Sequence, residues 1–163
     1  MSKTIFSTSI AFIVTASLVF LCLGLFGIAR HEMWRDEIDA WMAARNSSSV
    51  LELLSNVRYN GHPLLWYLIL YILSHFTNSL FCMQALHLII AFFSVFIFLS
   101  YSPFSRLQKV LFSFGYFPFY EYAIKSRNYG IGIFLIFLLC AIRDFYFFLL
   151  SYFYYARPIS LGL

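Results

Sequence analysis

The sequence has little charge. Only 11% of its 163 residues are Asp, Glu, Lys or Arg, whereas a soluble domain usually has about 25%. Hydrophobic residues make up 62% of the chain, so its preferred solvent is a lipid bilayer and we expect an integral membrane protein. The formal charge of +4 is spread along the chain, without the basic patch that binding to nucleic acid requires.

The sequence also lacks paired cysteines. Cys22, Cys82 and Cys140 stand singly in apolar stretches, and no CxxC pair occurs. Isolated thiols in apolar surroundings indicate packed or lipid-facing side chains rather than a disulfide framework or a metal site.

Long runs without charge predict the membrane-spanning helices. Residues 5–29 lie between Lys3 and Arg30, and about 20 apolar residues suffice to cross a bilayer. A cleaved signal peptide is the alternative, but its apolar core is typically about 7–15 residues, so we favour an uncleaved span. Further spans are expected over residues 80–101, 107–127 and 129–143. The apolar tail 144–163 is expected to begin another span that is cut short.

The hydrophilic segment 30–62 separates the first two spans. Residues 36–44 predict a short amphipathic helix, and Ser49 with Glu52 forms a capping-box pattern that predicts a second one through Val57. Residues 63–76 are apolar, but a helix of 14 residues covers only about 21 Å, which is too short for a span. We therefore expect 63–76 to be a juxtamembrane helix that does not cross.

The basic residues predict an orientation. Lys3, Arg106 and Lys109 should lie in the cytoplasm by the positive-inside rule. The loop 30–62 is then extracytoplasmic, which agrees with a non-crossing helix over 63–76. The predicted architecture is an all-α, multi-pass transmembrane helix bundle of about four spans, with extracytoplasmic juxtamembrane amphipathic helices.

Two charged clusters are predicted on the outer face. The first contains Asp36 and Glu37, and the second contains Glu121, Lys125 and Arg127. Paired carboxylates can act as a general base or hold a divalent cation, and Lys and Arg can bind phosphate. A carboxylate close to the membrane boundary, as expected for Glu121, is costly and therefore often functional.

Structural roles are the alternative for the same residues. Asp36 can cap a helix, and Arg35 with Asp39 can form an ion pair between residues four apart on a solvated helix face. Glu121 and Lys125 have the same spacing. His62, directly before Pro63, can bind a metal or a phosphate, but it can equally stabilise a turn.

The order of these motifs resembles a known family. The segments "WRDEIDAWMAARNSSSVLELLSNVRYNGHPLLWYLILY" and "FPFYEYAIKSRNYGIGIFL" are similar to the N-terminal part of GT-C fold glycosyltransferases, in particular bacterial relatives of glycosyltransferase family 39, the protein-mannosyltransferase-like group. The resemblance covers roughly residues 5–143. It implies an enzyme of the plasma (inner) membrane that transfers a sugar from a polyprenyl-phosphate donor to a glycan, lipid or protein acceptor on the extracytoplasmic side.

The resemblance also implies roles for individual residues. The acidic pair of the first outer loop matches Asp36 and Glu37, one of which would be the general base. The acidic position of the second outer loop matches Glu121, and Lys125 or Arg127 would hold the lipid phosphate. Some members of this class use a divalent cation and others do not, so the resemblance leaves the metal open.

Related enzymes are several hundred residues long, so the resemblance implies that these 163 residues are an N-terminal fragment. A small non-enzymatic multi-pass membrane protein is one alternative, in which both charged clusters only anchor helices. A transporter subunit is another, with Glu121 and Lys125 in a transport path. Transporters often have Gly- or Pro-broken helices in paired halves, a pattern that the sequence does not show.

Overall fold

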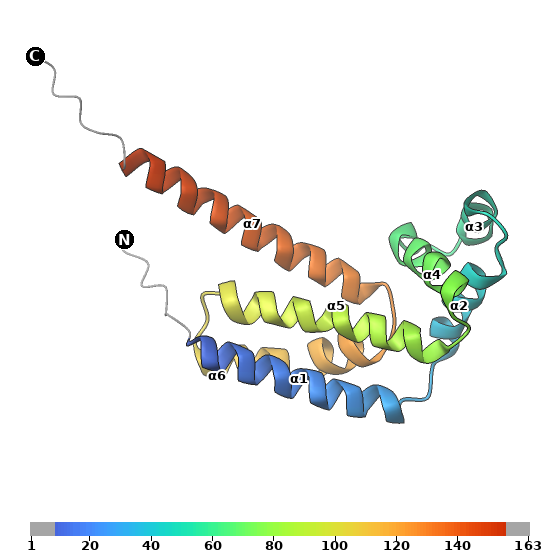
Figure 1. Ribbon diagram of the computed structural model, residues 1–163, viewed down its shortest axis with the longest axis horizontal. Helices are drawn as coiled ribbons and strands as arrows, with labels where there is room; N and C mark the ends of the chain where they lie inside the picture. The colour runs from blue at the N-terminus through green and yellow to red at the C-terminus, as the bar shows by residue number, and fades with distance from the viewer. Residues whose placement is uncertain (1–8, 156–163) are drawn as a thin grey trace, which may run out of the picture.

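The computed structural model describes the backbone of residues 9–155 and the side chains of residues 9–147. Within this range the chain is all-helical and has no strand, as the sequence predicts (Figure 1). Lys3, on which part of the predicted orientation rests, and the tail from residue 156 lie outside the described residues.

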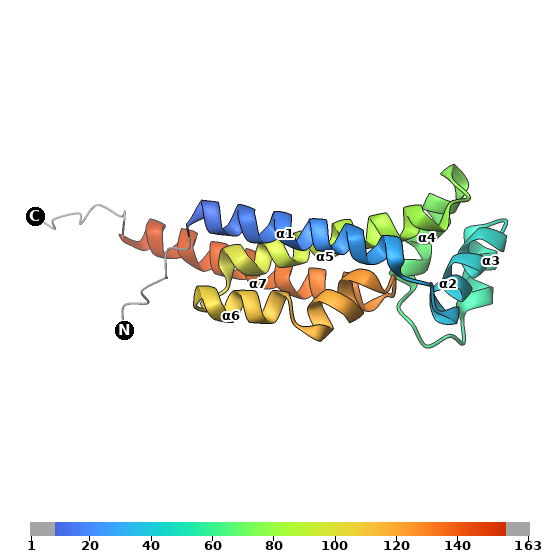
Figure 2. The same cartoon turned by 90° about the horizontal axis from the view of Figure 1, so that it is seen from below.

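Three long helices form the body of the molecule: α1 (Ile10–Arg30), α5 (Leu80–Tyr101) and α7 (Tyr129–Tyr155). All three are long and apolar enough to cross a membrane, α7 over its first 19 residues. α5 lies between α1 and α7; α1 runs antiparallel to α5, whereas α5 and α7 run in the same direction (Figures 1 and 2). The helix predicted over 80–101 has the predicted bounds.

The segment expected as a span over residues 107–127 is helical but is not one continuous helix. The structure has α6 (Arg106–Ser113) and a π-helix, η1 (Tyr116–Ile124), which follow each other along the bundle (Figure 2). In a continuous α-helix, Pro118 could not donate a backbone hydrogen bond, and its ring would clash with the carbonyl group of Phe114. Gly115 fits the break, because a Cβ there would lie 3.0 Å from the carbonyl oxygen of Leu111. Pro118 then falls in the first turn of η1, where proline is tolerated.

The last helix is longer than expected. The sequence predicts a span that ends at residue 143, whereas α7 continues to Tyr155. Arg143 and Asp144 are exposed and form an ion pair with an N–O distance of 3.0 Å. Because their side chains point outward and pair with each other, they leave the helical backbone hydrogen bonds intact.

Three short helices cover one end of the bundle (Figure 1): α2 (Arg35–Asn46), α3 (Val50–Val57) and α4 (Leu64–Phe76). The expected helices over 36–44, 49–57 and 63–76 are thus confirmed. Ser49 begins α3 as predicted, because its hydroxyl accepts a hydrogen bond from the backbone N–H of Glu52. We call these three helices the cap. The cap has an apolar core, made by the buried side chains of Trp41, Leu53, Trp66 and Leu70 together with Met83 from the start of α5.

The opposite end of the bundle is closed by a lysine. α5 ends at Tyr101 and α6 begins at Arg106, so the last carbonyl groups of α5 lack helical partners. Lys109 is buried and its Nζ donates a hydrogen bond to the carbonyl oxygen of Leu99 at 2.6 Å. This hydrogen bond from the lysine fixes the turn between the two helices.

Candidate functional site

The two predicted charged clusters meet at the end of the bundle that carries the cap. α2 begins there, and the loop 125–128 connects η1 to α7 there. Glu37 and Asp36 of the first cluster bond directly to Ser126 and Arg127 of that loop. The structure therefore joins residues that lie about 90 positions apart in the sequence into one group.

Glu37 ties the cap to the loop 125–128. Its side chain is completely buried. Oε1 accepts a hydrogen bond from the backbone N–H of Ser126 at 2.6 Å, and Oε2 accepts one from the backbone N–H of Trp34 at 2.9 Å. The Nε2 atom of His31 lies 2.9 Å from the same Oε2. Both carboxylate oxygens are occupied by protein groups, which is the arrangement of a structural tie.

Asp36 is the accessible carboxylate of the pair. Its side chain is 58% exposed, and Oδ2 accepts a hydrogen bond from a terminal guanidinium nitrogen of Arg127 at 2.7 Å. The Arg127 guanidinium also lies 5.3 Å from the ring centre of Tyr129. An ion pair this exposed contributes at most about 1 kcal/mol to stability, so an incoming ligand can replace either partner.

Glu121 and Lys125 form the predicted ion pair between residues four apart, with an N–O distance of 2.7 Å. Tyr116 donates a second hydrogen bond to the same oxygen of Glu121 at 2.8 Å. The ammonium group of Lys125 lies 4.5 Å from the ring centre of Trp34 and 5.1 Å from that of Tyr120. Trp34 is not among the predicted site residues. Tryptophan is common at the membrane–water interface, so its presence there does not by itself indicate a binding site.

Arg35 and Asp39 form the expected solvated pair. Their side chains are 91% and 65% exposed, and the closest N–O distance is 3.5 Å. This exposed pair supplies matched control positions for Arg127 and Asp36.

A small cavity lies beside the Asp36–Arg127 pair. Its volume is about 20 Å³, room for about one water-sized group and far too little for a sugar ring. His62 lines it, which places the predicted histidine in the same group. The lining residues are Asp36, Ala40, His62, Trp66, Tyr67, Ser126, Arg127 and Asn128. Trp66 and Ser126 could not be singled out from the sequence, because neither stands in a recognisable motif.

His87 holds the start of the same loop from α5. It is completely buried, and its Nε2 lies 2.9 Å from the carbonyl oxygen of Arg127. Its Nδ1 lies 3.4 Å from the carbonyl oxygen of Ala123. Gly130 gives the ring room, because a Cβ at that position would lie 2.6 Å from Nε2. Glu37 and His87 together fix the backbone from which Lys125 and Arg127 project.

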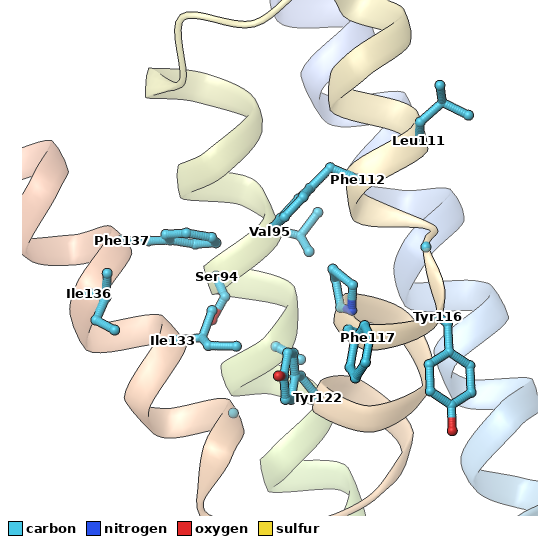
Figure 3. A pocket seen from close by; sticks show the side chains of 14 residues that line it. Ser94, Val95, Leu111, Phe112, Tyr116, Phe117, Tyr122, Ile133, Ile136 and Phe137 are labelled. Carbon is cyan, nitrogen blue, oxygen red and sulfur yellow. The ribbon is translucent and has the colours of Figure 1, made fainter.

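A larger cavity opens beside the break between α6 and η1 (Figure 3). Its volume is about 440 Å³, within the range of small-molecule sites. α5, α7 and both pieces of the broken helix contribute almost exclusively apolar side chains, among them Val95, Phe117, Ile133 and Phe137. Tyr116 lines this cavity and also bonds to Glu121, so the apolar cavity borders the charged group.

The charged group does not assemble a metal site. Among the residues that the structure describes, no three His, Cys, Asp or Glu side chains lie close enough together to hold an ion. Asp36 pairs with the side chain of Arg127, and Glu121 pairs with that of Lys125.

Comparisons with protein-family models, with curated proteins and with solved structures find no match for this chain. The family relationship suggested by residues 34–71 and 117–135 is therefore a hypothesis that rests on those residues.

Proposed function

We propose that this chain is the N-terminal part of a GT-C-like membrane glycosyltransferase. It transfers a sugar from a polyprenyl-phosphate donor to an acceptor hydroxyl on the extracytoplasmic side of the plasma membrane. The observation that supports this function best is the pairing of an exposed carboxylate, Asp36, with a half-buried guanidinium, Arg127, at 2.7 Å. In glycosyl transfer from a phosphate donor, a carboxylate can act as the general base and a guanidinium can stabilise the departing phosphate.

In the proposed reaction, Asp36 and Arg127 separate and each has its own role. The donor phosphate binds Arg127 and displaces Asp36, which frees the carboxylate to accept the proton of the acceptor hydroxyl. The acceptor oxygen then bonds to the anomeric carbon. The bond between that carbon and the phosphate oxygen breaks, and its electron pair stays on the departing polyprenyl phosphate. Lys125 and Arg127 stabilise the charge that develops on this leaving group.

The other predicted residues have supporting roles. Glu37 is a positioning residue, because both of its oxygens are bound to protein groups. Glu121 keeps Lys125 beside the Trp34 ring. His62 lies at the exposed mouth of the small cavity, where it can contact either substrate.

The function requires a defined topology. In this proposal α1, α5, the α6–η1 segment and α7 cross the membrane, α4 stays at the outer surface, and the cap faces away from the cytoplasm. Asn46 is exposed at the end of α2. In a variant without the three native cysteines, Asn46→Cys should react with an impermeant thiol reagent added outside intact cells. Reaction only after the cells are opened contradicts this orientation.

Donor binding is tested on the purified chain in lipid nanodiscs. The probe is a radiolabelled, photoreactive analogue of a polyprenyl-phosphate hexose. We expect the chain to be labelled, and Arg127→Ala to weaken binding about tenfold or more, because a charge-assisted hydrogen bond to phosphate is lost. Arg35→Ala is the matched control and should bind normally. Equal labelling of the Arg127 and Arg35 variants contradicts the phosphate site.

Sugar transfer is tested in membranes from cells that make the protein. Asp36→Asn should retain donor binding but abolish transfer to endogenous acceptors, since an amide cannot accept the proton. Asp39→Asn, which changes an exposed carboxylate only one turn away, should transfer normally. Undiminished transfer by Asp36→Asn contradicts its role as the general base.

A non-enzymatic membrane protein remains the second candidate. One observation favours it: Asp36 pairs with Arg127 and Glu121 with Lys125, and the cavity beside the first pair measures only about 20 Å³. In that case the ion pairs only fasten the cap to the bundle. The nanodisc experiment separates the two functions, because a purely structural group gives no saturable labelling.

A further inference from the structure

Two buried residues that line the small cavity each have a polar side-chain atom without a partner in the protein. The Nε1 of Trp66 and the Oγ of Ser126 are inaccessible and make no hydrogen bond. Both residues line the cavity beside the Asp36–Arg127 pair, and their side chains are 1% and 0% exposed. A buried polar group without a partner costs about 1–3 kcal/mol, so such groups usually mark the position of a ligand or an ordered water.

The chemistry of these atoms selects the ligand. An indole N–H can only donate a hydrogen bond, a serine hydroxyl can donate one, and a guanidinium has donors only. Trp66, Ser126 and Arg127 therefore present donors and one positive charge to the same small space. An oxygen atom with negative charge satisfies all three, whereas a metal cation is repelled by Arg127 and finds no ligand atom in the indole N–H of Trp66.

The backbone around the cavity is fixed before any ligand binds. The N–H of Ser126 is held by Glu37 and the carbonyl of Arg127 by His87. Trp66 packs edge-on against the His87 ring, with the ring centres 5.5 Å apart. The donors thus have little freedom to lose on binding, which is the condition for a preorganised anion site.

We propose that Trp66 and Ser126 donate hydrogen bonds to one oxygen of a phosphate group whose charge Arg127 balances. The inference rests on the proposed function and deepens it by naming the uncharged donors of its phosphate site. The shared chemistry is a phosphate, either the free ion or the phosphate of a lipid.

The size of the cavity fixes how the phosphate sits. A volume of about 20 Å³ accepts one oxygen atom, so the phosphorus and the remaining oxygens lie at the mouth. Asp36 and His62 are exposed there. Asp36 competes with the phosphate for Arg127, and Asp36→Asn should therefore bind phosphate more tightly than the wild type.

The test observes the indole N–H of Trp66 directly. The chain has three tryptophans, so selective ¹⁵N-indole labelling in nanodiscs gives three signals, which single Trp→Phe variants assign. Inorganic phosphate, and separately a polyprenyl phosphate in the bilayer, is titrated into the wild type. We expect the Trp66 proton signal to move downfield and saturate, while the signal of Trp41, which is buried in the cap core but does not line the cavity, moves little.

Two variants measure the contribution of each donor. Ser126→Ala removes only the hydroxyl and leaves the backbone bond to Glu37, and Trp66→Phe removes the N–H. Each should weaken phosphate binding about tenfold. Ser113→Ala is the matched control, because Ser113 is also buried with an unpartnered hydroxyl but lies in α6.

The outcomes separate this inference from the function on which it rests. If polyprenyl phosphate binds through Arg127 while Ser126→Ala and Trp66→Phe bind normally, the donor assignment is wrong and the proposed function stands. If no polyprenyl phosphate binds but inorganic phosphate shifts the Trp66 signal, the proposed function fails and the anion site stands as a site for the free ion. An unmoved Trp66 signal in both titrations overturns the inference and leaves the cavity as a site for water.

Discussion

Replacing Glu37 by Gln tests whether the buried carboxylate ties the cap to the bundle. The substitution preserves the shape of the side chain but replaces one acceptor oxygen by an NH₂ donor. In the structure one oxygen faces the N–H of Ser126, and the other faces the N–H of Trp34 and the ring of His31. Whichever way the amide turns, its NH₂ group meets a backbone N–H.

The expected cost follows from these contacts. At least one charge-assisted hydrogen bond is lost, and at least one buried backbone N–H stays without a partner. Lost bonds of this kind are worth about 1.5–3 kcal/mol and an unsatisfied buried group costs about 1–3 kcal/mol. Because the two contributions overlap, we expect Glu37→Gln to lower the free energy of unfolding by about 2–4 kcal/mol.

The measurement is equilibrium unfolding in mixed micelles with increasing SDS, followed by circular dichroism. Asp39→Asn is the control, since it removes a carboxylate of the same helix whose ion pair is exposed and contributes less than about 1 kcal/mol. If Glu37→Gln unfolds at the same SDS fraction as Asp39→Asn, the carboxylate does not hold the cap, and its assignment as a positioning residue is wrong.

Two further predictions concern other parts of the chain. Gly130→Ala should destabilise the protein by about 1–3 kcal/mol in the same assay, because its Cβ would collide with the His87 ring. Gly132→Ala, which meets no atom within 4 Å, should be neutral or stabilising by up to about 1 kcal/mol. Hydrogen bonds from Ser48 lower the pKa of Glu52 below its ordinary 4.5, so this group stabilises the fold above pH 4.5. We expect the difference in unfolding free energy between wild type and Glu52→Gln to be full at neutral pH and to vanish on acidification.

Features with a local cause could be predicted from the sequence. The helix Leu80–Tyr101 follows from an uncharged run of full span length, and the start of α3 follows from Ser49 with Glu52 three residues later. The Arg35–Asp39 pair follows from helical spacing alone. In each case the residues that decide the structure lie within one element.

The break at Gly115 could have been predicted but was not. Gly115 and Pro118 stand inside an apolar run whose length predicts one span, whereas a glycine and a proline at this spacing indicate a break within it. The charged pair Arg143–Asp144 predicts the end of a helix, whereas in the structure the pair is exposed and α7 continues to Tyr155.

The inner part of the candidate site could not be predicted. Asp36 and Glu37 have the same charge and adjacent positions, yet one is exposed and the other is completely buried. The difference depends on Ser126 and Arg127, which reach them only through the packing of four helical segments. Such a contact cannot be predicted from a local sequence pattern, and neither can the unpartnered hydroxyl of Ser126.

The bond between Glu37 and Ser126 also sets the order of events during synthesis. The two residues are 89 positions apart, so at translation rates of 5–20 residues per second Glu37 leaves the ribosome roughly 4 to 18 s before its partner. During that interval its carboxylate has only the neighbouring His31 and Trp34 as protein partners. The cap therefore cannot lock onto the bundle until the α6–η1 segment has been made and placed. The bond between Glu37 and Ser126 can thus form only after the later helices have reached their positions.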